Sequence, residues 1–339
     1  MTAPHAGIWA DSGPGVGRGH LARCCAVAGE LARLGVTVKL FTPDKDGERL
    51  AREAGVRVAV ADAVTVLAAG GPGLAIVDSY RAVASEVDAL RTAGLYVAAF
   101  DDTASDVLPA DLVINGAPGA ETAAYQQQPG RQYLLGAAFF PLRPEFRAAP
   151  LKTIRDTVDH VLVTVGGEDV HGLLGRFMTI AADCFEGARI IGVIGSRADM
   201  VRLEPAATDG APIGTLAAER CDVRYAPVDY PDLVRNADVI ICGGGQSLVE
   251  AAAAGAPAAA VVLGDDQRPQ RAAVIAAGAA LDGGDWRMTP AERAGRLRDA
   301  LEQLRSASVR ARISGCGLAL VDGGGARRIA KGMLDAWQA

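Results

Sequence analysis

The chain has 339 residues, of which 50% are apolar and 22% are charged, and its formal net charge is -6. A single hydrophobic core stops growing at about 250–300 residues, so this length predicts two folded domains. The composition excludes wholesale disorder, and the acidic balance argues against a nucleic-acid groove or a patch that binds anionic membranes.

Cysteine usage and apolar runs indicate the compartment. The six cysteines form no CxxC pair and no zinc-type spacing with histidine, so we expect them to be reduced and buried. The N-terminus lacks the basic start and apolar run of a signal peptide. No apolar run reaches the roughly 20 residues of a membrane span without glycine or charge. We therefore expect a cytoplasmic protein with no membrane insertion; the oligomeric state stays open.

In the first half of the chain, short apolar runs alternate with amphipathic helical patterns, which is typical of parallel α/β architecture. The predicted helices cover His20–Leu34, Asp46–Ala54 and Arg81–Thr92. The predicted strands are Gly7–Ala10, Thr37–Phe41, Val56–Val60, Leu74–Asp78, Tyr96–Phe100 and Asp111–Ile114. The segment Phe140–Pro150 carries three prolines and reads as a linker.

The same alternation restarts in the second half. The predicted helices are Tyr230–Asn236, Ser247–Ala254 and Arg268–Ala277, and two long helices close the chain, ending in Ala326–Trp337. The predicted strands are His160–Val165, Arg189–Ile194, Cys221–Tyr225, Val239–Cys242, Ala258–Val262 and Ala279–Leu281. We therefore predict a doubly wound domain over residues 1–145, a second over 146–325, and a C-terminal helix over 326–339. Ligands of such domains bind at the carboxyl ends of the strands.

A glycine-rich loop, Asp11–His20, follows the first predicted strand. Its glycines, including Gly17 and Gly19, allow the backbone to approach a ligand, and the next helix offers free N–H groups to an anion. The dinucleotide fingerprint is absent because His20 takes its last glycine position, which argues against NAD. The alternative is a glycine-rich turn without a ligand.

Side chains at the strand ends of the first half suggest chemistry. His20 fits a general acid or base, or else a helix-terminal histidine bonded to the backbone. Asp78 and Tyr80 would face the same cleft, unless Asp78 caps the next helix and Tyr80 packs at its start. Adjacent carboxylates on an extended chain point opposite ways, so Asp101 and Asp102 read as capping or solvated residues rather than metal ligands.

Two further strand–glycine turn–helix motifs, Val165–Asp169 and Cys242–Glu250, lie in the second half. Ser247 could cap its helix or contact a phosphate. Ser247 with Glu250 fits the capping box S-x-x-E, and Glu250 alternatively accepts hydrogen bonds from a ribose diol. Both readings stay open.

Together these motifs resemble the UDP-2,4-diacetamido-2,4,6-trideoxy-β-L-altropyranose hydrolases, the PseG enzymes of pseudaminic acid synthesis, which are similar to the MurG-type glycosyltransferases. The resemblance spans about residues 7 to 285. The segments that carry it, in order, are Gly17–Cys24, Val77–Tyr80, Phe100–Asp102, Tyr133–Gly136, Leu142–Phe146, Val165–Gly167, Gly243–Ser247 and Glu250.

The resemblance implies a GT-B fold, in which two Rossmann-like domains face a cleft and the second holds most of the UDP. It implies that His20 is the catalytic histidine, Tyr80 an active-site tyrosine and Glu250 the ribose contact. The diphosphate and uridine contacts it implies are the turns at Gly166, Gly167, Gly244 and Gly245.

One segment departs from the family. Where the family has Asn-Gln after a late strand, this chain has Asp265-Asp266-Gln267. We expect Asp266 at the sugar and Gln267 near the nucleotide.

We therefore predict a nucleotide-sugar hydrolase that releases UDP and a free amino or deoxy sugar. Water attacks the anomeric carbon with inversion, His20 is the base, and no metal or cofactor takes part. One alternative is a GT-B glycosyltransferase in which His20 activates an acceptor hydroxyl. Another is a non-catalytic protein that binds nucleotide sugars.

Overall fold

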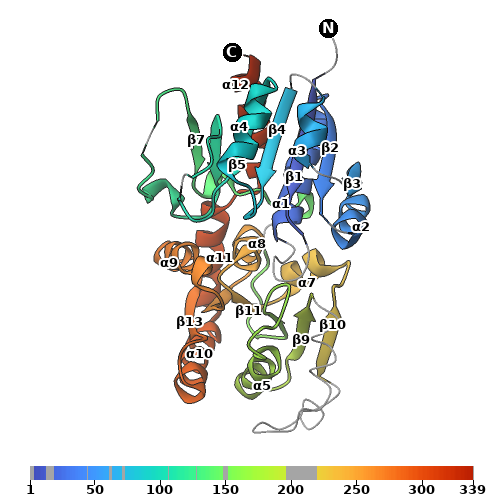
Figure 1. The fold of residues 1–339 in the computed structure, drawn as a ribbon. Coiled ribbons are helices and arrows are strands. Elements are labelled where there is room, and N and C mark those ends of the chain that lie inside the picture. Colours follow the sequence, from blue (N-terminus) through green and yellow to red (C-terminus); the bar gives the residue numbers. More distant parts are fainter. Residues whose placement is uncertain are drawn as a thin grey trace. The chain divides into compact units, whose positions relative to one another are not determined.

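The computed structural model describes residues 4–12, 19–43, 45–60, 63–70, 73–105, 107–126, 128–147, 152–195 and 220–338. The chain forms two compact units (Figure 1). Unit 1 comprises Met1–Arg147 and Gly323–Ala339, and unit 2 comprises Ala148–Asp322. Each unit holds one parallel β-sheet with helices packed against it.

The sheet of unit 1 has seven strands in the order β3-β2-β1-β4-β5-β6-β7. In β4 (Gly73–Asp78) every residue is buried, as expected of a central strand covered on both faces. The other strands are β1 (His5–Ala10), β2 (Thr37–Thr42), β3 (Val58–Val60), β5 (Leu95–Phe100), β6 (Leu112–Asn115) and β7 (Gln132–Leu135).

Successive side chains of β4 enter two different cores, because side chains alternate between the faces of a strand. Leu74 and Ile76 join the core that contains α1 (Gly19–Arg33) and α12 (Gly325–Gln338). Ala75 and Val77 join the core that contains α3 (Ala63–Ala68) and α4 (Ala84–Thr92). The other helical elements of unit 1 are α2 (Lys45–Glu53), η1 (Ala120–Thr122), η2 (Ala137–Phe139) and η3 (Pro144–Phe146).

Two segments of unit 1 are described in more detail by the structure than by the sequence. The expected linker contains η3, and its Leu142 and Phe146 are buried, so its described part up to residue 147 is packed structure. The helix predicted over residues 326–339 is α12, and its Ile329 and Met333 belong to the same core as α1. Apolar burial of this kind contributes about 1.5–3 kcal/mol per large side chain.

The sheet of unit 2 has six strands in the order β10-β9-β8-β11-β12-β13. These strands are β8 (His160–Thr164), β9 (Arg189–Ile194), β10 (Cys221–Tyr225), β11 (Val239–Gly243), β12 (Ala258–Val262) and β13 (Leu281–Asp285). The helical elements are α5 (Leu174–Cys184), α7 (Tyr230–Asn236), α8 (Gln246–Ala253), η5 (Asp265–Gln267), α9 (Arg268–Ala276), α10 (Pro290–Leu304) and α11 (Ala307–Leu320).

Most predicted strands match within two residues, and the exceptions have local causes. The strand expected at Ala279–Leu281 begins only at Leu281 and runs through Gly283 and Gly284, which have low strand propensity. A Cβ on Gly283 would lie 3.0 Å from Val261, so the neighbouring strand explains the glycine. Three helices, rather than two, close the chain, because a break at Ser306 separates α10 from α11.

Because the strands of each sheet are parallel, their carboxyl ends lie at the same end of that sheet. In unit 1, β1 pairs with β4, and in unit 2, β8 pairs with β11. At each of these pairs the chain order reverses, and ligands of such sheets bind beyond the carboxyl ends there. In the described part of the chain, no helix is both long and apolar enough to cross a membrane.

Candidate functional site

A polar cluster lies at the carboxyl ends of β1, β4 and β5 in unit 1. His20 stands in the first turn of α1, and its Nδ1 lies 2.6 Å from Oδ1 of Asp78, the last residue of β4. Arg23, one helical turn after His20, donates to both oxygens of Asp78 at 2.6 and 2.7 Å. The same guanidinium donates to both oxygens of Asp102 at 2.7 and 2.8 Å. The pairs join segments that are far apart in sequence.

The surroundings of His20 determine its tautomer. An ionised carboxylate only accepts hydrogen bonds, so the Nδ1 that faces Asp78 carries a proton. The contact of 3.1 Å between Arg23 Nη2 and the same Nδ1 then joins two donors and is no hydrogen bond. In neutral His20 the lone pair therefore resides on Nε2, which is the protonation state of a general base.

Charge pairing keeps Asp78 ionised. Burial by itself would raise the pKa of Asp78, but the Arg23 charge and the hydrogen bonds from Arg23 and His20 hold that pKa well below its ordinary value. Burial also acts to lower the pKa of Arg23, and the carboxylates of Asp102 and Asp78 overcome it and raise that pKa. The cluster is thus a permanently charged support for one imidazole.

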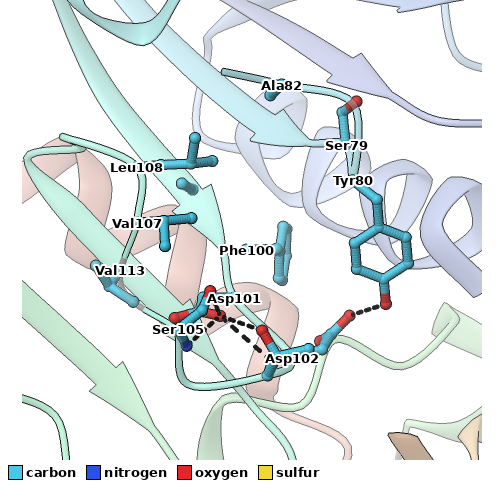
Figure 2. Close-up of a pocket in the computed structure, with 12 residues that line it drawn as sticks. Ser79, Tyr80, Ala82, Phe100, Asp101, Asp102, Ser105, Val107, Leu108 and Val113 are labelled. Carbon is cyan, nitrogen blue, oxygen red and sulfur yellow. Dashed lines mark hydrogen bonds between the residues drawn. The ribbon is translucent and has the colours of Figure 1, made fainter. Parts of the chain in front are cut away.

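Tyr80 lies over His20 at the rim of this cluster. The two rings meet edge to face with centroids 4.7 Å apart. The Tyr80 hydroxyl donates to Asp102 at 3.1 Å (Figure 2). Burial and the nearby Asp102 raise the pKa of Tyr80, so its hydroxyl stays protonated. The Tyr80 backbone N–H donates to the buried carboxylate of Asp11, which also accepts from Ser79 and Arg81.

The structure of unit 1 shows the partners of three aspartates, Asp78, Asp101 and Asp102. Asp78 does not cap the following helix, since α4 begins at Ala84 and Asp78 binds His20 and Arg23. Asp101 organises its own turn, where it accepts from Thr103 and Ser105, as a capping residue does. Asp102 was wrongly grouped with it, because Asp102 is part of the cluster.

Arg23 was missed by sequence reasoning altogether. Its position three residues after His20, on the same helix face, was the available signal. Among the predicted loop contacts, Gly19 begins α1, and Gly17 lies outside the described residues.

In unit 2, two glycine turns follow the adjacent strands β8 and β11. Gly166 has a φ of 96°, a conformation that other residues adopt only with strain. Gly244 donates its N–H to Gln267 Oε1 at 2.9 Å, and its carbonyl accepts from Gln270 at 2.7 Å. A Cβ on Gly244 would lie 2.9 Å from that of Arg271, so α9 and the turn before it hold this loop tightly. Gly167 and Gly245 belong to the same two turns.

The capping-box reading of Ser247 and Glu250 is wrong. Helix α8 begins at Gln246, its N-cap is Gly245, and no side chain bonds the cap. Ser247 is therefore inside the first turn. Glu250 is buried, and it accepts a hydrogen bond of 3.1 Å from Gln246, one turn earlier.

The segment that departs from the family forms the short helix η5, which follows β12. Asp266 is exposed, whereas Asp265 pairs with Arg268 and Arg287. Gln267 Oε1 accepts the hydrogen bond from the Gly244 N–H, so Gln267 holds the Gly244 turn in place. Across the described ranges, no three His, Cys, Asp or Glu side chains gather as a set of metal ligands would.

No family model and no curated protein matches this sequence. Solved structures match over nearly the whole chain. MurG of Acinetobacter baumannii has 16% identity and a TM-score of 0.61 over 98% of this chain and 99% of its own. The glycotransferase of kitacinnamycin has 16% identity and a TM-score of 0.66 over 99% of this chain and 100% of its own.

A third match has a nucleotide sugar bound. Anabaena Alr3699/HepE in complex with UDP-glucose has 15% identity and a TM-score of 0.63, over 98% of this chain and 99% of its own. At such identities the similarity establishes the fold alone. The chain has the GT-B fold, with two Rossmann-like domains, of which these glycosyltransferase structures are examples.

Proposed function

We propose that this chain is an enzyme that cleaves the bond between the anomeric carbon and the diphosphate of a nucleotide-activated sugar, with His20 as general base. The observation that carries the proposal is the 2.6 Å contact between His20 Nδ1 and Asp78. It supports the imidazole tautomer that carries its proton on Nδ1 and leaves Nε2 as the acceptor. A well-placed base accelerates such a step by about 10²–10⁴-fold.

The reaction needs only the nucleotide sugar and an attacking hydroxyl group or water molecule. Nε2 of His20 removes the proton from an attacking hydroxyl or water oxygen, and that oxygen forms a bond to the anomeric carbon. The bond from the anomeric carbon to the phosphate oxygen breaks, and the nucleoside diphosphate leaves with the electron pair. Attack from the face opposite the leaving group inverts the anomeric configuration. Tyr80, edge-on to His20, would orient the attacking group.

Unit 2 would bind the leaving nucleotide. The turns at Gly166–Gly167 and Gly244–Gly245 follow adjacent strands, and α8 starts directly after the second turn. Backbone N–H groups at a helix start stabilise the negative charge that grows on a diphosphate. We assign Ser247 to the phosphate and Glu250, whose Oε1 accepts a hydrogen bond from Gln246, to the ribose.

The attacking oxygen distinguishes two forms of the activity. We favour an acceptor hydroxyl, because MurG and the kitacinnamycin glycotransferase share the fold and because a pocket adjoins Tyr80. Water is the second candidate, and the ordered motifs shared with the altropyranose hydrolases favour it. In either form the exposed Asp266, an acceptor only, would suit a sugar with free hydroxyl or amino groups.

The test measures nucleoside diphosphate release from a panel of UDP-sugars, with and without alcohol acceptors. His20→Asn should lower kcat by two to four orders of magnitude and keep nucleotide affinity. His160→Asn is the matched control, because His160 begins β8, away from the carboxyl ends, and should keep full activity. Release that needs an acceptor supports transfer, and release in water supports hydrolysis. Binding without release would overturn the enzyme proposal and leave a nucleotide-sugar binding protein.

A further inference from the structure

The loop between β8 and α5 contains a histidine that the proposed mechanism does not use. His171 Nε2 lies 3.0 Å from the carbonyl oxygen of Leu263, the residue directly after β12. A carbonyl oxygen only accepts hydrogen bonds, so Nε2 carries a proton and is the donor. In the sheet, β11 lies between β8 and β12. The hydrogen bond therefore joins the segments on both sides of β11, from which the Gly244 turn continues.

The imidazole of His171 also stacks on an indole ring. Its plane is 10° from that of Trp286, and the two ring centroids are 4.2 Å apart. Trp286 follows β13 directly, its N–H donates to the Val262 carbonyl at 2.9 Å, and its own carbonyl accepts from Arg293 at 2.9 Å. The stack fixes the plane of the imidazole, and the hydrogen bond to Leu263 fixes its direction.

A continuous chain of hydrogen bonds leads from His171 to the second glycine turn. Leu263 accepts from His171 through its carbonyl and donates its N–H to Gln267 Oε1 at 3.4 Å. The same Oε1 accepts the Gly244 N–H at 2.9 Å. His171 itself belongs to the loop that begins with the first turn, Gly166–Gly167. His171, Leu263 and Gln267 thus link the two turns that follow the adjacent strands β8 and β11.

We propose that His171 is a positioning residue, which holds the two glycine turns in the arrangement that receives a nucleoside diphosphate. The inference rests on the function proposed above for the identity of that ligand. Backbone N–H groups bind a diphosphate best when they already point toward it, because no free energy is then lost in ordering them. Without the His171 donor, the loop after β8 is no longer tied to the segment that holds Gln267. We therefore expect both turns to loosen together.

The first measurement needs no nucleotide. His171→Phe keeps an aromatic ring against Trp286 and removes the donor, so exchange of the Gly244 amide hydrogen should become at least about tenfold faster. Mass spectrometry of a peptide that contains Gly244 measures this rate. His171→Gln offers an amide N–H in place of Nε2 and should restore slow exchange. A purely local role of His171 would speed exchange in its own loop and leave the Gly244 amide unchanged, and that result would overturn the inference.

The second measurement is calorimetric titration with UDP. His171→Phe should weaken UDP binding about threefold to tenfold, as expected for the loss of one hydrogen bond. His171→Gln should stay within about twofold of the wild-type affinity, because it keeps a donor. His160→Phe is the matched control, because His160 begins β8, at the opposite end of the strand from the turns, and it should change neither measurement.

The outcomes separate the positioning role from the nucleotide site. Equal UDP affinities in wild type and His171→Phe, or equal losses in His171→Phe and His160→Phe, would overturn the positioning role. An affinity of His171→Gln as low as that of His171→Phe would also overturn it, because the donor would then have no effect. If His171→Phe speeds exchange at Gly244 and none of the proteins binds UDP, the link between the turns stands and the proposed nucleotide site is overturned.

Discussion

His20 Nδ1 lies 2.6 Å from Asp78 Oδ1, and both side chains are buried although they come from different strand–helix connections. The carboxylate selects the tautomer of the imidazole and stabilises the imidazolium that forms when Nε2 takes a proton. This pair, rather than His20 alone, is the unit whose loss should stop the reaction.

Asp78→Asn should lower kcat by about two to four orders of magnitude and leave KM for the nucleotide sugar nearly unchanged. The amide can donate to Nδ1, which would move the imidazole proton to Nε2 and abolish the base. Steady-state kinetics together with nucleotide titration check this. A kcat within a few-fold of the wild-type value would show that Asp78 does not orient the base.

Arg23 is a positioning residue, and its effect should appear in the pH profile. Arg23→Gln removes the main charge that lowers the pKa of Asp78, so that pKa should rise. The acidic limb of kcat/KM should then move to higher pH, and Arg23→Lys should lie between wild type and Arg23→Gln.

Arg81→Gln is the control for Arg23, because Arg81 also pairs with a buried aspartate, Asp11, but is largely exposed. Asp11 keeps its hydrogen bonds from Ser79 and the Tyr80 N–H in that variant, so its profile should match the wild type. Coincident profiles for all four proteins would show that Arg23 has no part in positioning the base.

Acid should destabilise unit 1 through Asp78. Its folded-state pKa lies below its unfolded value, so the ionised carboxylate contributes stability that is fully present above the unfolded pKa of about 3.9. That contribution is lost as the pH falls below about 4 toward the folded-state pKa. The melting temperature, followed by circular dichroism from pH 6 to pH 3, should therefore fall more steeply in wild type than in Asp78→Asn. Parallel curves would contradict the assignment.

Gly244→Ala should weaken nucleotide binding, because the new Cβ would lie 2.9 Å from Arg271 and the turn would have to shift. Gly295→Ala in α10 is the matched control in the same unit, since its Cβ meets nothing within 4 Å. The control should stabilise the protein by about 0.5–1 kcal/mol, because alanine favours a helix over glycine. Calorimetric titration with UDP should separate the two, and equal affinities would remove the Gly244 turn from the nucleotide site.

A pair of variants can distinguish a ribose-binding role of Glu250 from a structural role of its hydrogen bond with Gln246. If Glu250 binds ribose, Glu250→Ala should raise KM about tenfold or more, whereas Gln246→Ala removes one hydrogen bond to the carboxylate and should keep or lower KM. If their hydrogen bond is only structural, both variants should lose about 0.5–1.5 kcal/mol of stability with KM unchanged. Thermal melting and KM measured on one preparation decide between these results.

Local patterns in the sequence were sufficient to predict the two parallel sheets and most of their strands and helices. Buried parallel strands read as short apolar runs, and α1 shows the helical period through Leu21, Cys24, Ala28 and Leu31. The strand β7 was not predicted, because Gln132–Leu135 is an edge strand of the sheet and none of its residues is fully buried. The glycine turns were also visible, since glycine marks positions where only its backbone freedom fits.

The tertiary structure alone decided the partners of the polar side chains. Arg23 and Asp102 are 79 residues apart, and only the pairing of β1 with β4 and of β4 with β5 brings α1 next to the end of β5. Ser247 and Glu250 show the converse, because their spacing fits a capping box but the helix begins two residues too early for Ser247 to be its N-cap. Hydrophobic periodicity is a local property, whereas ion pairs and helix starts depend on what the rest of the chain places beside them.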